Sequence, residues 1–525
     1  MKKKSGNSGR KTAVLGKVTL RTWLSKNRKF LLTVGICVLL AAVFVLLRSW
    51  STSILYPDYL SYGGDKDSGD SLQFMTMGKM WLAGKIPYIQ FFDHKGPWVF
   101  FCDMLGFWIG GGARYGIMIL QIIALAITFY YVLKLGRLVS ENKLWSWMIL
   151  AMTMIYIAVS YASGNSVQEW NLPFIAVAVY YMVEFFYRDK ASQREHSPKY
   201  ALIYGITIGA CFLAQATHAI LICAGVLVIF VMLVLEKNWK NLRQNLLYGL
   251  AGLIGILLPF VIYFAVVGAL GEFFYYTFIY NMFYTANIGS WLKGATANDV
   301  MMFTMVFFPF FCAFLTAILA WMRGKKPYAI TLIIAGILEG YLFLSAQAFH
   351  HYVLPFVFQL PLFLNEVYLM RQDDEAWRLL RMWIVTLFLI LTYNLTTSQL
   401  SLMVAVYNDV RASKIEGIGY EALVKRHENE LKTEGLTVYG ANQLKGAYLM
   451  YDILPHNRFF IIQAWHASMN QDLAAEIYED FTENQPEYLL LDKYYLENPY
   501  NINEILKKDY KEIDKDGIYH LYQLK

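Results

Sequence analysis

The sequence predicts an α-helical polytopic membrane protein that carries a small α/β domain at its C-terminal end. Of its 525 residues, 57% are hydrophobic and only 16% are charged, with a mean hydropathy of +0.38, whereas soluble chains are about a quarter charged. Apolar stretches of membrane length recur through residues 30–403, and residues 404–525 contain none. A soluble enzyme, a secreted scaffold and a disordered chain are excluded, because the apolar excess must face lipid.

The net charge of +7 divides unevenly between these two parts. Residues 1–403 hold 33 Lys and Arg against 19 Asp and Glu, and residues 404–525 hold 13 against 20. The basic excess is the loop charge expected of a membrane domain, so no nucleic-acid partner is inferred.

The five cysteines lie in apolar segments without a C-x-x-C pair, so neither a disulfide framework nor a structural zinc site is expected.

The first predicted span is residues 30–47, which are uncharged and long enough to cross a hydrocarbon core of about 30 Å. Residues 1–29 carry ten Lys or Arg and form a basic cytoplasmic N-terminus before an uncleaved anchor. Ten further spans are predicted, which makes about 11 transmembrane helices in residues 30–403. They are residues 115–136, 144–160, 172–187, 200–213, 218–236, 247–268, 300–321, 328–346, 352–370 and 383–403.

The positive-inside rule supports this count. With a cytoplasmic N-terminus, the outside loops 161–171, 214–217 and 347–351 contain no Lys or Arg, and 269–299 contains only Lys293. Every inside loop is basic. Eleven spans then place the C-terminal domain outside the cell membrane.

The apolar stretch 98–112 cannot be another span, because one more crossing would invert every later loop. It is predicted to be an interfacial or re-entrant segment, which Asp103 within it favours. Residues 49–97 become a long first outside loop. In the soluble domain 404–525, residues 436–439, 459–462, 488–491 and 517–522 are predicted strands, and residues 472–483 a helix.

Polar clusters in the outside loops are the candidate sites. The acidic segment 65–70, with Asp67 and Asp70, could supply a general base; the alternative is a solvated loop that caps the following helix. Lys95 with His94 stands at headgroup depth, where a cation binds a lipid phosphate or simply anchors the interface.

The third and fourth clusters are more ambiguous. Glu169 is the only acid in its outside loop, where a satisfied loop carboxylate is the simpler alternative. His351 and Tyr352 follow another histidine at the membrane face, where they could bind phosphate, a metal or sugar hydroxyls, or form interfacial hydrogen bonds. Charges inside the spans do not form an ion path, which weakens a transporter interpretation.

The first outside loop resembles that of bacterial GT-C glycosyltransferases, the relatives of protein mannosyltransferases and lipid A aminoarabinose transferases that use polyprenyl-phosphate sugars. The segments that carry the resemblance are Asp70-Ser71-x-x-Phe74, Gly78-x-x-x-x-x-Gly84-Lys85-Ile86-Pro87-Tyr88 and Phe92-Asp93-His94-Lys95-Gly96-Pro97. The loop around Glu169 and the pair of His351 with Tyr352 also resemble positions of that superfamily. The resemblance covers about residues 1–403. It includes the order of a cytoplasmic N-terminus, a long first outside loop, many spans and a soluble outside C-terminal domain.

The resemblance implies roles for individual residues. The catalytic aspartate of the family falls on Asp70, with Asp67 as a near alternative, and the lysine that faces the lipid phosphate falls on Lys95. Gly96 stands where the K-P-P form of the motif has proline. The residues expected to bind the donor phosphate are Lys95, His94, His218 and His351, and those expected to bind substrate are Asp93, Glu169, Asn165 and Tyr352.

The acidic pair that many relatives carry in the second outside loop is here Gln168 and Glu169, so only one of the two can ionise. A divalent metal is therefore not supported, and no cofactor is predicted. The implied function is transfer of a sugar, with inversion, from a polyprenyl-phosphate donor to an extracytoplasmic glycan, lipid or protein. The alternative is a lipid-linked carrier or flippase, which predicts symmetric halves and charges near the midplane; neither is found.

Overall fold

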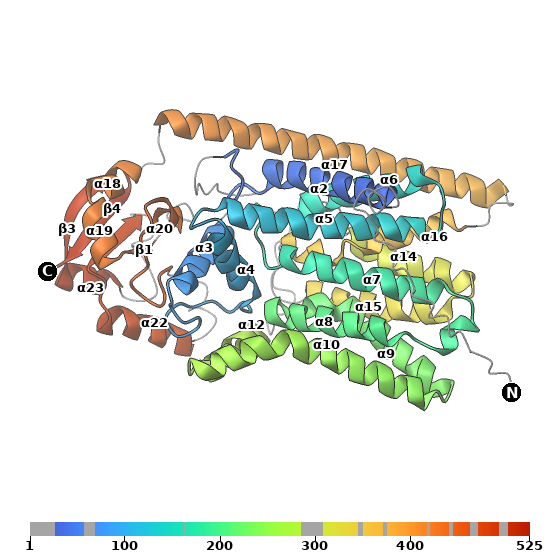
Figure 1. Ribbon diagram of the computed structural model, residues 1–525. Helices are drawn as coiled ribbons and strands as arrows, with labels where there is room; N and C mark the ends of the chain where they lie inside the picture. Colours follow the sequence, from blue (N-terminus) through green and yellow to red (C-terminus); the bar gives the residue numbers. More distant parts are fainter. Residues whose placement is uncertain are drawn as a thin grey trace, which may run out of the picture.

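The computed structural model describes residues 27–56, 69–161, 163–284, 308–344, 350–370, 375–416, 420–439, 445–461, 471–492 and 502–525. Long helices lie side by side in a bundle, and a smaller domain with a β-sheet lies at one end of it (Figure 1). The helices of the bundle are α2 (Arg28–Arg48), α5 (Tyr115–Arg137), α6 (Lys143–Ser160), α7 (Leu172–Tyr187), α8 (Pro198–Ala214), α9 (Ile220–Leu235), α10 (Trp239–Val266), α14 (Phe308–Met322), α15 (Lys326–Leu344), α16 (Gln359–Tyr368) and α17 (Glu375–Glu416).

Each of the eleven predicted spans overlaps one of these helices, although the overlap of residues 352–370 with α16 is only partial. Within the described ranges, six helices are long and apolar enough to cross a membrane by length and composition. The number of crossings therefore stays a prediction. The bundle buries apolar side chains such as Phe129, Ile149 and Val179 between its helices.

Helices α8 and α10 approach each other closely through glycines. A Cβ added at Gly205 would lie 1.9 Å from the carbonyl oxygen of Gly249, and one at Gly252 would lie 2.3 Å from that of Leu202. Small residues at a helix contact are typical of membrane proteins, where dispersion packing drives association.

The tenth predicted span, residues 352–370, is not one continuous α-helix. A 3₁₀ segment, His350–Phe356, precedes α16, which at ten residues is about 15 Å long and too short to cross alone. Pro355 lies in the first piece and Pro361 in the second, and proline interrupts the α-helical hydrogen bonds.

Two helices of the first outside loop and its continuation lie between the bundle and the sheet domain (Figure 1). They are α3 (Gly69–Leu82) and α4 (Trp98–Ile109), which pack against each other. Helix α4 has 12 residues and a length of about 18 Å, so it is a short helix beside the bundle. Two further pieces, α11 (Leu270–Phe274) and α12 (Tyr280–Tyr284), flank the π-helical turn Tyr275–Ile279.

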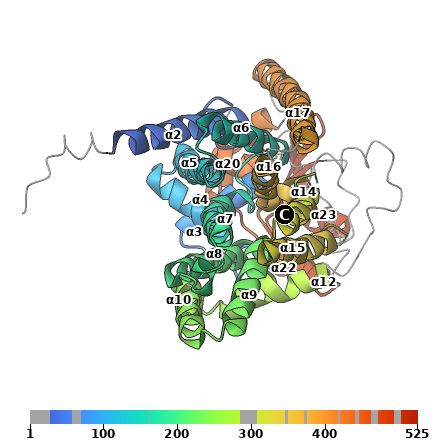
Figure 2. The ribbon, with the colours of Figure 1, turned by 90° about the vertical axis from the view of Figure 1, so that its right-hand side faces the viewer.

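Helix α17 connects the bundle to the C-terminal domain. It lies at the edge of the bundle beside α6 and α16 (Figure 2). With 42 residues it continues to Glu416, so the predicted boundary between residues 403 and 404 falls inside this helix. The hydrophobic stretch ends near that boundary while the helical conformation does not.

The C-terminal domain is α/β. Its sheet has the order β1-β2-β4-β3, with β1 parallel to β2 and the other neighbours antiparallel. The strands are β1 (Thr437–Tyr439), β2 (Tyr488–Asp492), β3 (Tyr510–Asp516) and β4 (Tyr519–Leu524), and the helices are α18 (Glu421–Arg426), α19 (Glu428–Glu434), α20 (Gly446–Met450), α22 (Gln471–Glu483) and α23 (Ile502–Asp509).

Two features of this sheet depart from the prediction. The predicted strand 459–462 forms, within its described residues, only an isolated bridge between Ile461 and Val438. The carbonyl of Phe460 accepts a hydrogen bond from Tyr448 at 2.6 Å instead. Strand β3 was not predicted because five of its seven residues are charged, which is typical of an edge strand.

Candidate active site

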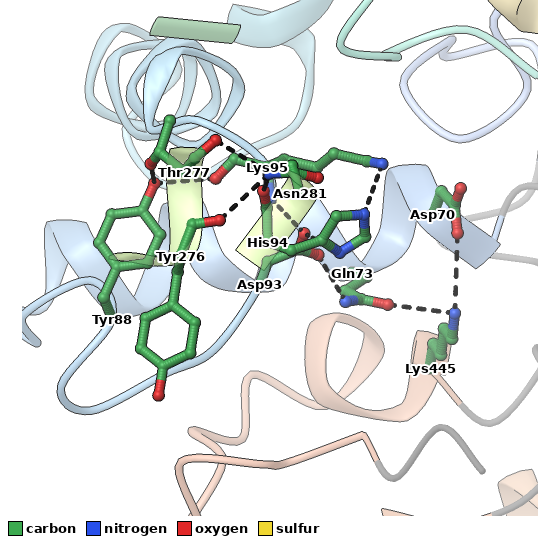
Figure 3. A network of polar contacts seen from close by, with 10 residues as sticks. All are labelled: Asp70, Gln73, Tyr88, Asp93, His94, Lys95, Tyr276, Thr277, Asn281 and Lys445. Carbon is green, nitrogen blue, oxygen red and sulfur yellow. Dashed lines mark hydrogen bonds and ion pairs between the residues drawn. The ribbon is translucent and has the colours of Figure 1, made fainter. Parts of the chain in front are cut away.

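The loop between α3 and α4 is held from two sides at His94 and Lys95 (Figure 3). The Tyr88 hydroxyl donates to the carbonyl of Lys95 at 2.8 Å, and the Asn281 side-chain amide donates to the carbonyl of His94 at 2.7 Å. Thr277 in turn donates to the Tyr88 hydroxyl at 3.3 Å. Tyr88 is buried and has a φ of 68°, a conformation that bulky residues rarely adopt.

Four of the predicted site residues gather around the ammonium group of a fifth, Lys95. Its Nζ lies 2.8 Å from His94 Nε2 and 6.0 Å from the centre of the Tyr352 ring. The His351 ring packs on Tyr352 with 4.8 Å between centroids, and both Lys95 and His351 interact electrostatically with His218. The Lys95 side chain is half-buried, so part of this cluster is accessible from outside the protein.

Gly96 brings this loop into direct contact with the end of α8. Its N–H donates to the carbonyl of Ala214 at 3.1 Å, and a Cβ at this position would lie 2.0 Å from the carbonyl oxygen of Leu213. Proline would supply that Cβ and remove the N–H. The close approach explains why glycine stands here in place of the proline of the K-P-P motif.

Asp93 holds the loop from within. Its Oδ1 accepts from the backbone N–H of Lys95 at 2.8 Å, and its Oδ2 accepts from the Gln73 side chain at 2.9 Å. Burial raises the pKa of Asp93 to about 6, an effect that nearby Lys95 opposes. These contacts orient the loop, and the expected role of Asp93 in binding substrate stays a prediction.

Asp70 lies in the first turn of α3, where a carboxylate is favoured by the helix dipole. Its side chain is 69% exposed, and its Oδ1 lies 4.0 Å from Nζ of Lys445. Lys445 comes from the C-terminal domain, 375 residues further along the chain, and no motif in the sequence singles it out. Asp67, the alternative base, lies outside the described residues.

Glu169 forms part of a closed network in residues 161–171, the predicted second outside loop. Its carboxylate accepts hydrogen bonds from the Tyr161 hydroxyl, from the Gln121 amide at 3.0 Å and from the backbone N–H of Asn165 at 2.7 Å. The side chain is fully buried, and burial raises the pKa of Glu169 to about 7. Because protein donors surround it, this carboxylate is poorly placed to bind a metal ion.

Asn165 extends this network toward α4. Its Nδ2 donates to Asp103 at 3.1 Å, and its Oδ1 accepts from the Trp170 indole at 3.0 Å. Burial raises the pKa of Asp103 well above its usual range. The expected contact of Asn165 and Glu169 with substrate stays a prediction, because their described contacts all lie within the protein.

The two loops meet at His218, where the Asn171 side-chain amide lies 2.7 Å from Nδ1. An amide nitrogen can only donate, so Nδ1 of His218 accepts and the ring proton lies on Nε2. Across the residues that the structure describes, no group of three or more His, Cys, Asp or Glu side chains could hold a metal ion.

The chain is similar in sequence and in structure to proteins of known fold. The family model of the dolichyl-phosphate-mannose-protein mannosyltransferases matches residues 94–264, a range that begins at His94. ArnT from Cupriavidus metallidurans bound to undecaprenyl phosphate has a TM-score of 0.54 at 14% identity, over 94% of this chain and 98% of ArnT. The chain has the GT-C glycosyltransferase fold.

The apo state of the same ArnT gives a TM-score of 0.51 at 13% identity, over 95% of this chain and 98% of ArnT. No sequence among the curated proteins matches significantly. The predicted GT-C fold class is confirmed, and the family model agrees with the predicted resemblance over residues 94–264. The predicted class of enzyme, a membrane glycosyltransferase, stays a prediction.

Proposed function

We propose that this GT-C protein transfers a sugar from a polyprenyl-phosphate donor to a hydroxyl group of an extracytoplasmic glycan, lipid or protein. One observation carries the proposal: a carboxylate, Asp70, and a half-exposed ammonium group, Lys95, lie on the same unit of α3 and its following loop. A chain of polar contacts through Lys445, Gln73 and Asp93 joins Asp70 to the backbone N–H of Lys95 (Figure 3).

The chemistry needs both charges. The oxygen of the acceptor hydroxyl forms a bond to the anomeric carbon, and its proton passes to the Asp70 carboxylate. The bond between the anomeric carbon and the phosphate oxygen breaks, and its electron pair leaves with the polyprenyl phosphate. Direct attack from the opposite face inverts the anomeric centre.

Lys95 stabilises the phosphate as it leaves. Preorganised cations at the position where negative charge develops typically contribute the largest electrostatic effect in such a site. His94, His218 and His351 lie around the same ammonium group, and we assign them to the phosphate as well. The apolar donor tail lies in the bilayer.

The proposal places the site at the extracytoplasmic face. Helices α3 and α4 and the C-terminal domain lie at the same end of the bundle (Figure 1), and the outside loops there are almost free of Lys and Arg. The N-terminus is then cytoplasmic, and the C-terminal domain faces the acceptor.

The test is transfer of labelled sugar from membrane lipid to acceptor, in membranes that contain wild type or one variant at matched expression. Asp70→Asn and Lys95→Ala should each lower the rate on the order of 10²–10³-fold, because each removes a charge that acts in the transition state. Lys432→Ala is the control, since this lysine is exposed on the C-terminal domain beside Glu428.

Asp67→Asn decides between the two possible bases. Loss of transfer with Asp67→Asn but not with Asp70→Asn would move the base to Asp67 and keep the function. Full transfer in the Asp67, Asp70 and Lys95 variants would overturn the enzymatic proposal and favour a lipid-linked carrier.

A further inference from the structure

Lys445 is a buried lysine at the start of α20 that faces the candidate base. Its side chain is 6% exposed, whereas that of Asp70, 4.0 Å away, is 69% exposed. The Lys445 ammonium group donates to Oε1 of Gln73 at 3.2 Å. Lysine side chains are almost never buried to this degree unless they are paired.

The charges around Lys445 explain how the burial is tolerated. Removing an ammonium ion from water is costly unless opposite charge and hydrogen bonds compensate. Asp70 supplies one carboxylate directly, and Asp93 supplies a second, since it interacts electrostatically with both Asp70 and Lys445. Lys445 therefore belongs to the charge system of the candidate active site.

Gln73 joins Lys445 to the loop that carries Lys95. Its Nε2 donates to Asp93, and its Oε1 accepts from Lys445. The two ends of the amide differ, so a cation on one side and a carboxylate on the other determine its orientation. The result is a continuous polar chain from Lys445 through Gln73 and Asp93 to the backbone N–H of Lys95.

Contacts on both sides of Lys445 hold the C-terminal domain against the outside loops. Lys79, nearer the other end of α3, forms an ion pair with Asp452. On the other side, the N–H of Phe92 donates to the carbonyl of Arg458 at 3.2 Å, and the rings of Phe92 and Phe459 pack at 5.1 Å. The position of Lys445 is thus a property of the docked domain.

We propose that Lys445 is a positioning residue for sugar transfer, with which the C-terminal domain completes the active site by holding the Asp70 carboxylate toward the acceptor hydroxyl. This inference rests on the proposed function. Lys445 acts through Asp70 and touches neither the donor nor the acceptor. The domain is then a part of the catalytic unit as well as a surface near the acceptor.

The experiment compares three variants of the full-length protein in membranes. Lys445→Gln removes the charge, Lys445→Arg keeps it, and Asp452→Asn weakens the other ion pair between α3 and the domain. Asp452 is the matched control, because its side chain is 76% exposed and the pair lies away from Asp70. The measurements are kcat, the acceptor KM, binding of labelled polyprenyl phosphate, and the melting temperature.

Lys445→Gln should lower kcat roughly 10- to 100-fold, which corresponds to loss of one interaction with a charged group. The acceptor KM and donor binding should remain within about twofold of wild type, because the substitution removes contacts to Asp70 and Gln73 and none to the donor or the acceptor. Lys445→Arg should recover most of kcat, and Asp452→Asn should match wild type.

Four outcomes would overturn the inference. They are wild-type kcat in Lys445→Gln, a raised acceptor KM with unchanged kcat, no recovery in Lys445→Arg at wild-type melting temperature, and an equal loss in Asp452→Asn, which would reduce Lys445 to a docking contact. Asp70→Asn separates this failure from that of the proposed function. If Asp70→Asn is inactive while Lys445→Gln is active, the function stands and only the role of Lys445 falls.

Discussion

The predicted first and second outside loops are both rich in polar residues, yet the structure gives their charged side chains opposite environments. In the first loop, the Lys95 side chain stays half-buried and the Asp70 side chain stays mostly exposed. In the second loop, Glu169 and Asn165 are fully buried and hydrogen-bonded within the protein. The first loop leaves these charged groups partly exposed, whereas the second encloses its carboxylate in hydrogen bonds.

This difference shows that polar residues beside a membrane fall into two kinds. A charge that is to act on substrate needs partners that leave part of its surface accessible, and the half-buried Lys95 beside His94 meets this condition. A carboxylate surrounded by several donors, such as Glu169, instead stabilises a loop that would otherwise bury unsatisfied groups. The number of donors around a carboxylate therefore separates the two kinds better than its place in the sequence.

Among the substitutions that test this difference between the two loops, Gly96→Ala should give the largest loss of transfer rate. The new methyl group would lie 2.0 Å from a backbone oxygen of α8, so the loop must move and carry Lys95 with it. A displacement of about 1 Å in an active site typically lowers the rate about 100-fold. Gly271→Ala is the control, because nothing lies within 4 Å of its added Cβ.

Transfer assays with both glycine variants at matched expression check this prediction. Wild-type transfer in Gly96→Ala would mean that the loop tolerates displacement and that the first loop is less rigid than its contacts indicate.

A smaller effect is expected from Asp93→Asn. The amide keeps one acceptor oxygen but offers an N–H where Asp93 accepts from either Lys95 or Gln73, so we expect about a tenfold loss of rate. Because burial raises the pKa of Asp93 to about 6, wild-type transfer should fall as the pH drops through that value and the carboxylate gains a proton.

The measurement is a rate profile from pH 5 to 8 for wild type and Asp93→Asn. The variant should lack the inflection near pH 6, since its side chain does not titrate. The same inflection in both proteins would assign it to another group.

The smallest effect on transfer is expected from Glu169→Gln, which should change stability more than activity. The substitution places an N–H opposite the donors of Tyr161, Gln121 or Asn165. It should lower the free energy of unfolding by about 1–3 kcal/mol. Transfer by the folded protein should stay within about threefold of wild type, because the network lies apart from the reacting groups.

The loss of stability in Glu169→Gln should depend on pH. The pKa of Glu169 is raised from 4.5 to about 7 in the folded protein, so the folded state binds this proton more tightly than the unfolded state. This group stabilises the fold most at pH below about 4.5 and loses that contribution as the pH rises to about 7. Melting temperatures in detergent should therefore differ more between wild type and variant at pH 6 than at pH 8.

A loss of transfer in Glu169→Gln without a change in melting temperature would contradict the comparison. Glu169 would then act at the active site in spite of its burial.

Local patterns predicted most of the bundle, because a span must be long and apolar wherever it lies in the chain. The same logic failed for residues 352–370, where the chain forms a 3₁₀ segment that contains Pro355 and then the separate short helix α16. It also missed β3, whose charged residues suit a sheet edge that only the neighbouring strand β4 creates.

The sequence alone determined the membrane class, the helical spans and the loop that carries Asp70 and Lys95, because hydropathy and a local motif are properties of neighbouring residues. Only the tertiary structure decided that Glu169 is enclosed by donors, that Gly96 touches α8, and that Lys445 faces Asp70. These facts depend on contacts between segments far apart in the chain, up to 375 residues for the last pair. Such contacts arise when the domains pack, and no local pattern encodes them.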